Sequence, residues 1–196
     1  MGKRHTGVAC SGLITAGLML GMSQAQAQAL EPWQLDWHAW GEERPADALC
    51  RGVYVMPAYR LPASDDPERV SAESDSGYYG DDGETILRGD VVLRRDTAQL
   101  EGPQVRVPGS RERAFVEGPL ALRDQGLLVR GQSGELSLVS DAAQVDEAHY
   151  VVHEQRLRGD ARQLERLEDG RYRLTTANFT TCDPGDNLWQ LATSDL

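Results

Sequence analysis

The sequence has 196 residues, enough for one domain of ordinary size, and its 31 acidic residues outnumber its 20 basic residues. The resulting formal net charge of −11 repels phosphate backbones, and no basic cluster offsets it locally. We therefore expect no nucleic acid as a partner. An acidic balance also suits a soluble surface in general, so it selects no function by itself.

The first residues have the organisation of a signal peptide. Lys3 and Arg4 precede an apolar stretch diluted by glycines, residues 8–22, and the small residues Ala25 and Ala27 offer a cleavage site. A membrane-spanning helix needs about 20 strongly apolar residues, more than this stretch supplies. We predict a signal peptide over residues 1–27 and an exported protein.

Residues 28–75 are predicted to form an N-terminal segment and a linker. Trp33, Trp37 and Trp40 are spaced by four and three residues, which on a helix would place their indoles on one side. This spacing suits an anchor for a membrane surface or a partner, but it also suits a terminal segment that packs onto the main domain. We favour the second interpretation, because one short helix is marginal without tertiary support. The Pro-, Ser- and Asp-rich residues 62–75 are predicted to form a loop.

Two cysteines, Cys50 and Cys182, lie outside the predicted signal peptide. An exported bacterial protein meets an oxidising compartment, so we expect these thiols to bond to each other or to another chain segment. They form no closely spaced CxxC motif, which argues against a structural zinc site or a redox centre.

The stretch from residue 87 to residue 131 contains the same pattern twice. Residues 87–94 (LRGDVVLR) align with residues 116–123 (VEGPLALR), and residues 100–102 align with residues 129–131. Each copy has two short apolar runs punctuated by glycine, which is typical of β-strands. A period of about thirty residues favours stacked β-units whose apolar faces are buried by their neighbours. The alternative is a chance resemblance within an ordinary β-sandwich.

Further strands are expected toward the C-terminus, within residues 135–140, 148–153, 156–167 and 171–179. Asp169 and Gly170 indicate a hairpin turn between the last two. Residues 157–160 (LRGD) match residues 87–90 almost letter for letter, so we interpret them as a third, looser repeat.

Neither a metal site nor a catalytic group stands out in the sequence. Asp81, Asp82 and Glu84 lack the spacing of a calcium loop and are explained by a turn. His149 and His153 enclose a strand-like run, and four residues of strand span about 13 Å, too far for both to ligate one ion. No serine has a GxSxG context. We expect no cofactor, no metal and no enzymatic activity.

Residues 179–189 (FTTCDPGDNLW) resemble the F-T-[ST]-C-x-P-G-x-x-x-W signature of the LptD family of lipopolysaccharide (LPS) assembly proteins, also called OstA or Imp. Residues 80–91 (GDDGETILRGDV) resemble the periplasmic domain of the same family. The resemblance covers about residues 50–196. It implies an all-β domain over residues 76–196, in which short antiparallel strands stack into an open, V-shaped β-jellyroll or β-taco of the OstA-like type.

In this family the apolar interior of the V takes the acyl chains of LPS. Alternate strand residues point to opposite faces, so one face of the twin repeat can line such a trough. The trough candidates are Leu87, Val91, Leu93, Leu100, Leu120, Leu122 and Val129. An ordinary dry core formed by the same residues is the alternative.

The resemblance further implies transport of LPS at the periplasmic face of the outer membrane. The domain would receive LPS from an LptA-like bridge protein by strand addition and pass it to a β-barrel that holds an LptE-like lipoprotein plug. The family barrel follows the cysteine signature, whereas this sequence ends at Leu196, so we expect a fragment or a truncated product. Cys50 and Cys182 match the family's N-terminal cysteines, which bond to a cysteine pair at the far end of the barrel.

Two alternatives to this function remain open. A soluble LptA-like bridge protein has the same OstA-like unit, although the signature around Cys182 argues against it. An exported enzyme acting on polysaccharides from a β-solenoid would need a cluster of acids on one open face.

Overall fold

The computed structural model describes residues 31–48 and 50–196, so the signal peptide predicted over residues 1–27 lies outside the described residues. Strands make up almost all of the regular structure, as predicted for an all-β chain. Two short 3-10 helices, η1 (Pro32–Leu35) and η2 (Gly41–Glu43), lie in the N-terminal segment. The strands are β1 (Trp37–Ala39), β2 (Gly52–Tyr54), β3 (Ser71–Glu73), β4 (Ser76–Tyr79), β5 (Thr85–Arg95), β6 (Ala98–Val107), β7 (Arg113–Asp124), β8 (Leu127–Ser137), β9 (Ala143–Val152), β10 (Leu157–Arg166), β11 (Tyr172–Thr180) and β12 (Leu191–Asp195).

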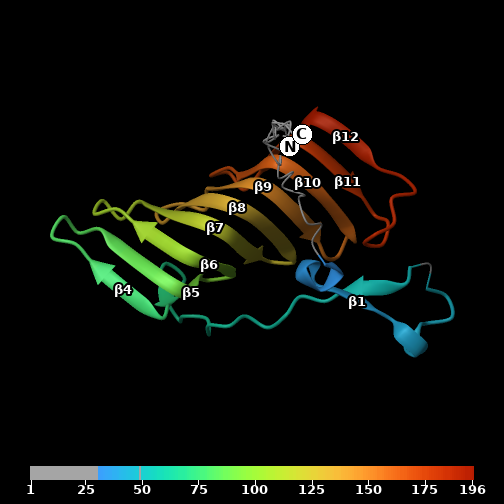
Figure 1. The fold of residues 1–196 in the computed structure, drawn as a ribbon, viewed down its shortest axis with the longest axis horizontal. Coiled ribbons are helices and arrows are strands. Elements are labelled where there is room, and N and C mark those ends of the chain that lie inside the picture. Colours follow the sequence, from blue (N-terminus) through green and yellow to red (C-terminus); the bar gives the residue numbers. More distant parts are fainter. Residues whose placement is uncertain (1–30, 49) are drawn as a thin grey trace, which may run out of the picture.

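Strands β3 to β12 form one antiparallel sheet of 10 strands, in which consecutive strands from β5 to β12 are also neighbours in space. Strand β12 forms one edge, and β3 and β4 both pair with β5 at the other edge. The two edges do not pair with each other, so the sheet is open, and Figure 1 shows it curving from β4 at one end to β12 at the other. This is the open antiparallel architecture that the sequence predicts.

The long strands bend near their middles, and these bends divide the sheet into two arms. The pairing register shifts in β5 between Arg88 and Val91 and in β7 between Glu117 and Leu120. Gly89 and Gly118 lie at these shifts with φ of 76° and 96°, a conformation that is strained for residues with a side chain. Arm 1 comprises residues 85–88, 104–107, 113–117, 133–137, 143–146, 163–166 and 172–175, and arm 2 comprises residues 91–95, 98–101, 120–124, 127–130, 148–152, 157–161 and 177–180.

The twin repeat is confirmed as two structurally equivalent hairpins. Val91 pairs with Gly102 in the first hairpin, and Leu120 pairs with Gly131 in the second, the register that the sequence alignment predicts. The prediction of a third repeat at residues 157–160 is wrong. Residues 157–160 lie in arm 2 on a strand that runs in the opposite direction to β5, and Gly159 pairs with Tyr150 and Phe179 rather than forming a bend.

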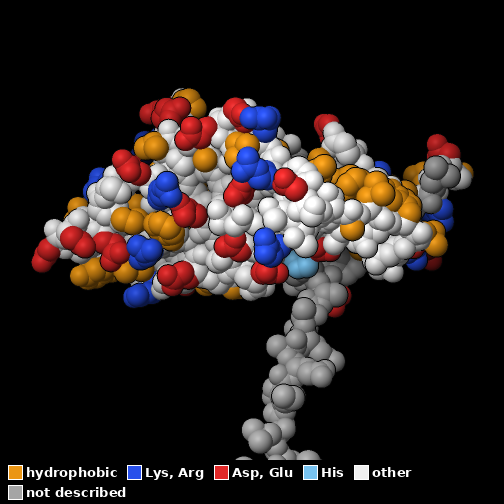
Figure 2. Space-filling model, turned by 90° about the horizontal axis from the view of Figure 1, so that it is seen from above, with side chains coloured by type: hydrophobic (Ala, Val, Ile, Leu, Met, Phe, Trp, Pro, Cys, Tyr) orange, Lys and Arg blue, Asp and Glu red, His pale blue; other side chains and the backbone are white. Residues whose placement is uncertain are grey.

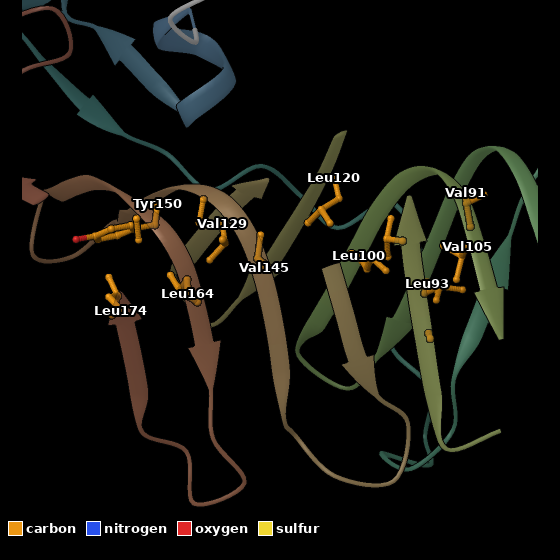
Figure 3. Close-up of a cluster of buried hydrophobic side chains, with 14 of the residues drawn as sticks. Val91, Leu93, Leu100, Val105, Leu120, Val129, Val145, Tyr150, Leu164 and Leu174 are labelled. Atoms are coloured by element: carbon orange, nitrogen blue, oxygen red, sulfur yellow. The ribbon is translucent and has the colours of Figure 1, made fainter. Parts of the chain in front are cut away.

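The main core lies between the two arms. Side chains of both arms point toward one another there, as Figure 3 shows for Tyr150 of arm 2 and for Leu164 and Leu174 of arm 1. The cluster also contains Val91, Leu93, Leu100, Val105, Ala114, Val116, Leu120, Val129, Val145, Ala148, Ala161 and Ala177. An apolar side chain that leaves water contributes roughly 25 cal/mol per Å2, so the bend stabilises the fold by letting one sheet bury its own apolar face.

A second cluster covers the outer face of arm 2. Residues 31–61, which we call the N-terminal cover, place Trp37 and Tyr54 against Leu128 and Val151. The Tyr59 hydroxyl donates a hydrogen bond of 2.6 Å to the carbonyl of Thr97 at the same face. Arm 2 is thus buried on both faces, which explains the unbroken apolar runs at residues 91–93, 127–129 and 150–152.

The tryptophan stretch does not form the helix that its spacing suggests. Helix η1 ends at Leu35, Asp36 has φ of 61°, and Trp37 begins strand β1, so the helical pattern is interrupted. The packing interpretation is confirmed for Trp37, whose ring meets the edge of Tyr54 at a centroid distance of 4.9 Å. The local geometry changes because strand β1 pairs with β2 and because tertiary packing outweighs weak helix propensity.

Candidate functional site

A cavity opens between the arms at the C-terminal end of the sheet. Its volume is about 500 Å3, within the range of roughly 300–1,000 Å3 that is common for small-molecule sites. We call it the end cavity. It is lined by Asp124, Gln125, Leu127, Tyr150, Val152, Leu157, Leu164, Arg166, Tyr172, Leu174, Phe179 and Leu196.

The wall of the end cavity is mainly apolar, because it is formed by inward-facing side chains of both arms. Arm 2 supplies Leu127, Val152 and Leu157, and arm 1 supplies Leu164 and Leu174. These residues alternate along their strands with outward residues, as a pleated strand requires. The cavity therefore suits an extended apolar group that enters from solvent.

Tyr150 adds a hydroxyl group to this wall, and the hydroxyl has a hydrogen-bond partner. Its hydroxyl donates a hydrogen bond of 2.9 Å to the carbonyl of Asn178. Burial raises the pKa of Tyr150 to about 12, so the phenol stays neutral at physiological pH. The ring thus presents an apolar face to the cavity, while its hydroxyl is held by the neighbouring strand.

The seven predicted trough residues all lie in the cluster between the arms, and none of them lines the end cavity. Leu87 and Leu122 are half-buried, and Val91, Leu93, Leu100, Leu120 and Val129 are buried. Leu122 and Val129 line a smaller hollow of about 50 Å3 beside the end cavity. Most of the twin repeat thus forms the closed part of the interior, while Leu127 of its second copy lines the end cavity.

Sequence reasoning missed the residues that line the open part. Tyr150, Leu157, Leu164 and Leu174 lie in runs predicted as strands, yet none was a trough candidate. Their alternation with polar residues was a usable signal in β10 and β11. The missing information was the partner arm, because the opposing side chains decide whether an inward residue meets a neighbour or a void.

Cys50 and Cys182 are brought into one region, and both thiols are free. The backbone nitrogen of Arg51 donates a hydrogen bond of 2.8 Å to the Asp183 carboxylate, so the residues that follow the two cysteines are in contact. A hydrogen bond with Thr180 lowers the pKa of the Cys182 thiol below 9.0, which increases the reactive thiolate fraction.

Arg158 holds the loop that carries Cys182. Its guanidinium donates to the backbone carbonyls of Cys182, Asp183 and Asp186 at 3.0, 3.1 and 2.7 Å. One planar cation with several donors thus fixes the loop through three carbonyls at once. The loop position therefore depends on arm 2, where Arg158 lies.

His149 and His153 take part in separate interactions. His149 contacts Asp160 through Nδ1, and this hydrogen bond, aided by the charges around it, lowers the pKa of Asp160 below 3.8. His153 contacts Asp36 through Nε2 at 3.1 Å. Within residues 31–48 and 50–196, no three His, Cys, Asp or Glu side chains are grouped to hold a metal ion.

Among the same described residues, no helix has the length and apolar character needed to cross a membrane. Apolar side chains instead gather at the two ends of the long axis on the face shown in Figure 2, with acidic and basic side chains interspersed between them. The exposed apolar residues include Tyr78 and Tyr79 at the β4 edge and Leu188, Trp189 and Leu191 near the β12 edge. Both open edges of the sheet thus carry exposed apolar side chains.

Comparison with known proteins gives consistent results. No protein-family model matches the sequence. The whole chain is 54% identical to the LPS-assembly protein LptD of Chromohalobacter salexigens and spans 23% of that protein. Over 152 residues, 75% of the chain, it is 34% identical to LptD of Pseudomonas putida strain W619, of which this part is 16%. The chain therefore spans less than a quarter of the curated relatives that it matches.

A solved structure has a similar fold. It is the crystal structure of LptH, described as the LptA homologous periplasmic component of the conserved lipopolysaccharide transport device from Pseudomonas aeruginosa. The match has a TM-score of 0.50 and 14% sequence identity, and it covers 66% of this chain and 98% of LptH. At this identity the likeness shows a shared fold, an open antiparallel sheet of the same kind.

Proposed function

Since the chain belongs to the LptD family of LPS-assembly proteins, whose N-terminal part it matches, we propose that it is the periplasmic domain that guides LPS toward the outer membrane. The end cavity is the observation that supports this role best. It is apolar, open to solvent and formed between two arms of one sheet. A fatty acyl chain gains about 0.8 kcal/mol for each CH2 group that leaves water, so such a wall holds lipid without any covalent chemistry.

We assign a direction of transfer to the two edges of the sheet. Strands β3 and β4 form one edge, and an LptA-like bridge protein would add a strand there by backbone hydrogen bonds. The exposed Tyr78 and Tyr79 on β4 would extend that contact. At the β12 edge the lipid would pass to an outer-membrane barrel, which holds an LptE-like lipoprotein.

The cysteines would connect this domain to that barrel. Cys50 and Cys182 lie in one region and Cys182 is activated, so both are placed for exchange with cysteines of a following segment. A disulfide there would fix the end cavity opposite the barrel. The domain would then work at the periplasmic face of the outer membrane.

The end cavity gives no support to the alternative of a polysaccharide-acting enzyme. Glycoside cleavage needs two carboxyl groups on either side of the scissile bond. Asp124 is the one carboxylate among the residues that line the end cavity, and it is engaged by Arg166 at 2.6 Å. Transport by apolar contact requires no such pair.

Photocrosslinking to LPS tests the proposal. A photoreactive residue in place of Leu174, on the cavity wall, should crosslink to LPS in cells that produce the protein. The matched control is Arg173, the adjacent residue, whose exposed side chain pairs with Glu165 on the outer face of arm 1. Crosslinks from position 173 and none from position 174 would contradict the proposal.

A further inference from the structure

The two arms form a V. We call the strand ends farthest from the bend the tips of the arms, and the opening between the tips the mouth. Two ion pairs join the tips across the mouth. Arg95, at the end of β5 in arm 2, contacts Asp141, which lies in the turn between β8 and β9 at the tip of arm 1. Arg166, at the end of β10 in arm 1, lies 2.6 Å from Asp124 at the end of β7 in arm 2. A distance of 3.7 Å between Arg166 and Asp141 links the two pairs into one network.

Neighbouring groups hold this network in place. The Arg95 guanidinium also donates to the backbone carbonyls of Leu138 and Ser140, at 3.3 and 3.0 Å, on the opposite tip. The Thr97 hydroxyl donates to the second carboxylate oxygen of Asp124 at 2.7 Å. The side chains of Asp124 and Arg166 are 9% and 23% exposed, so solvent screens this pair less than it screens freely exposed ones. Arg95 is 18% exposed, whereas its partner Asp141 is 55% exposed.

The network lies at a boundary inside the molecule. Toward β5 the arms meet in a closed cluster that contains Leu93, Leu100 and Val105. Toward β11 they enclose the end cavity, whose lining includes both Asp124 and Arg166. Among the residues that the structure describes, the ion pairs that bridge the arm tips are Arg95 with Asp141 and Arg166 with Asp124. Within this described part of the chain, none bridges the tips beyond Arg166 toward β12.

We propose that Arg95, Asp141, Arg166 and Asp124 form an ion-pair latch that closes the β5–β8 part of the mouth and opens when lipid passes. This inference rests on the proposed function, because a lipid that enters at the β3 and β4 edge must cross the closed cluster to reach the end cavity. The phosphate groups of LPS would open the latch by taking the place of the two aspartates. Arginine binds phosphate through two parallel hydrogen bonds, as it binds carboxylate.

The latch is tested by distance measurements between spin labels on the two tips. Labels replace Asp96 of arm 2 and Val139 of arm 1, which are both exposed, in the full chain with Cys10→Ser, Cys50→Ser and Cys182→Ser. Asp124→Asn with Asp141→Asn removes both negative charges while keeping side-chain size. We expect the ratio of long to short distances to rise about tenfold, which corresponds to about 1.4 kcal/mol.

Two further measurements separate a latch from general damage. Glu135→Gln removes the ion pair to Arg113, which lies within arm 1, and it should leave the distances unchanged. The protein without latch substitutions should show a smaller opening in 1 M NaCl, because salt screens partly buried charges only in part. Unchanged distances in both the double variant and high salt would overturn the latch.

Adding LPS distinguishes a failure of the latch from a failure of the proposed function. We expect LPS to lengthen the distances, whereas a neutral alkyl glycoside detergent should not. Crosslinking of LPS from position 174 with distances that stay short would overturn the latch and leave the lipid trough intact. Suppose instead that the label distances lengthen in the double variant and in 1 M NaCl, but no position crosslinks to LPS. This result would support the ion pairs as a closure but overturn their role in lipid passage.

Discussion

Asp36 and Arg123 lie 87 positions apart in the chain and form a buried ion pair. The pair fastens the N-terminal cover to the outer face of arm 2, and the side chains are only 6% and 10% exposed. His153 approaches the same carboxylate at 3.1 Å, while its other ring nitrogen faces the carbonyl of Gly126 at 2.6 Å. Arg123 and His153 thus both contact this one carboxylate.

Asp36→Asn should destabilise the protein strongly. The substitution leaves the buried Arg123 without its counter-charge, and breaking a buried pair typically costs about 3–5 kcal/mol. The free energy of unfolding, measured in urea, checks this. The matched control is Asp169→Asn, since the pair of Asp169 with Arg171 is exposed to solvent and should contribute little.

The contribution of Asp36 should also disappear in acid. Burial alone would raise the pKa of Asp36, but hydrogen bonds with His153 and Arg123 outweigh it and hold the pKa below the ordinary 3.8. A carboxyl whose pKa is lower in the folded state stabilises above its unfolded pKa and loses this effect as pH falls through the folded value. The stability difference from Asp36→Asn should therefore be full near pH 6 and shrink below pH 3.8. A constant difference down to pH 2 would contradict this account.

Gly131→Ala should be poorly tolerated at the bend of β8. An added Cβ would lie 2.2 Å from a methyl carbon of Val145 and 2.7 Å from the carbonyl oxygen of Asp146, so the neighbouring strand would have to move. Overpacking of this kind costs about 1–3 kcal/mol. Thermal unfolding measures the loss. Gly77→Ala serves as the control, because its Cβ would meet only a methyl group of Leu87 at an ordinary 3.4 Å.

Cys182→Ser should affect assembly more than folding. The thiol is free in this domain, so its loss should change the free energy of unfolding of the isolated chain very little. In a full-length relative it should impair assembly of the outer-membrane form, which non-reducing electrophoresis detects. Equal losses in the two measurements would point to a bond internal to this domain.

Much of the fold follows from local sequence. Short apolar runs closed by glycine predict strands, and the aligned residues 87–94 and 116–123 predict two like hairpins, which the pairing of Val91 with Gly102 and of Leu120 with Gly131 confirms. The same local reasoning failed at residues 157–160. Four matching letters do not determine the strand direction, which depends on how many strands precede them in the sheet.

The candidate site was only partly predictable. Sequence alternation identified inward residues of the twin repeat, but Leu164 and Leu174 became the cavity wall because the arm opposite them leaves space. In the twin repeat, Leu93 and Leu100 meet Val105 and Ala114 and close the interior. Alternation gives the face of a strand and carries no information about the distance to the opposing arm.

The sequence by itself determined the strands, the repeated hairpins and the family, because these depend on neighbouring residues and on a motif around Cys182. Only the tertiary structure decided where the interior opens, how the N-terminal cover is held and which charges meet across the mouth. Asp124 and Arg166, or Asp36 and Arg123, become partners only when a single sheet bends back on itself and the preceding segment folds over it. The physical reason is that these contacts join positions whose separation in the chain bears no fixed relation to their distance in space.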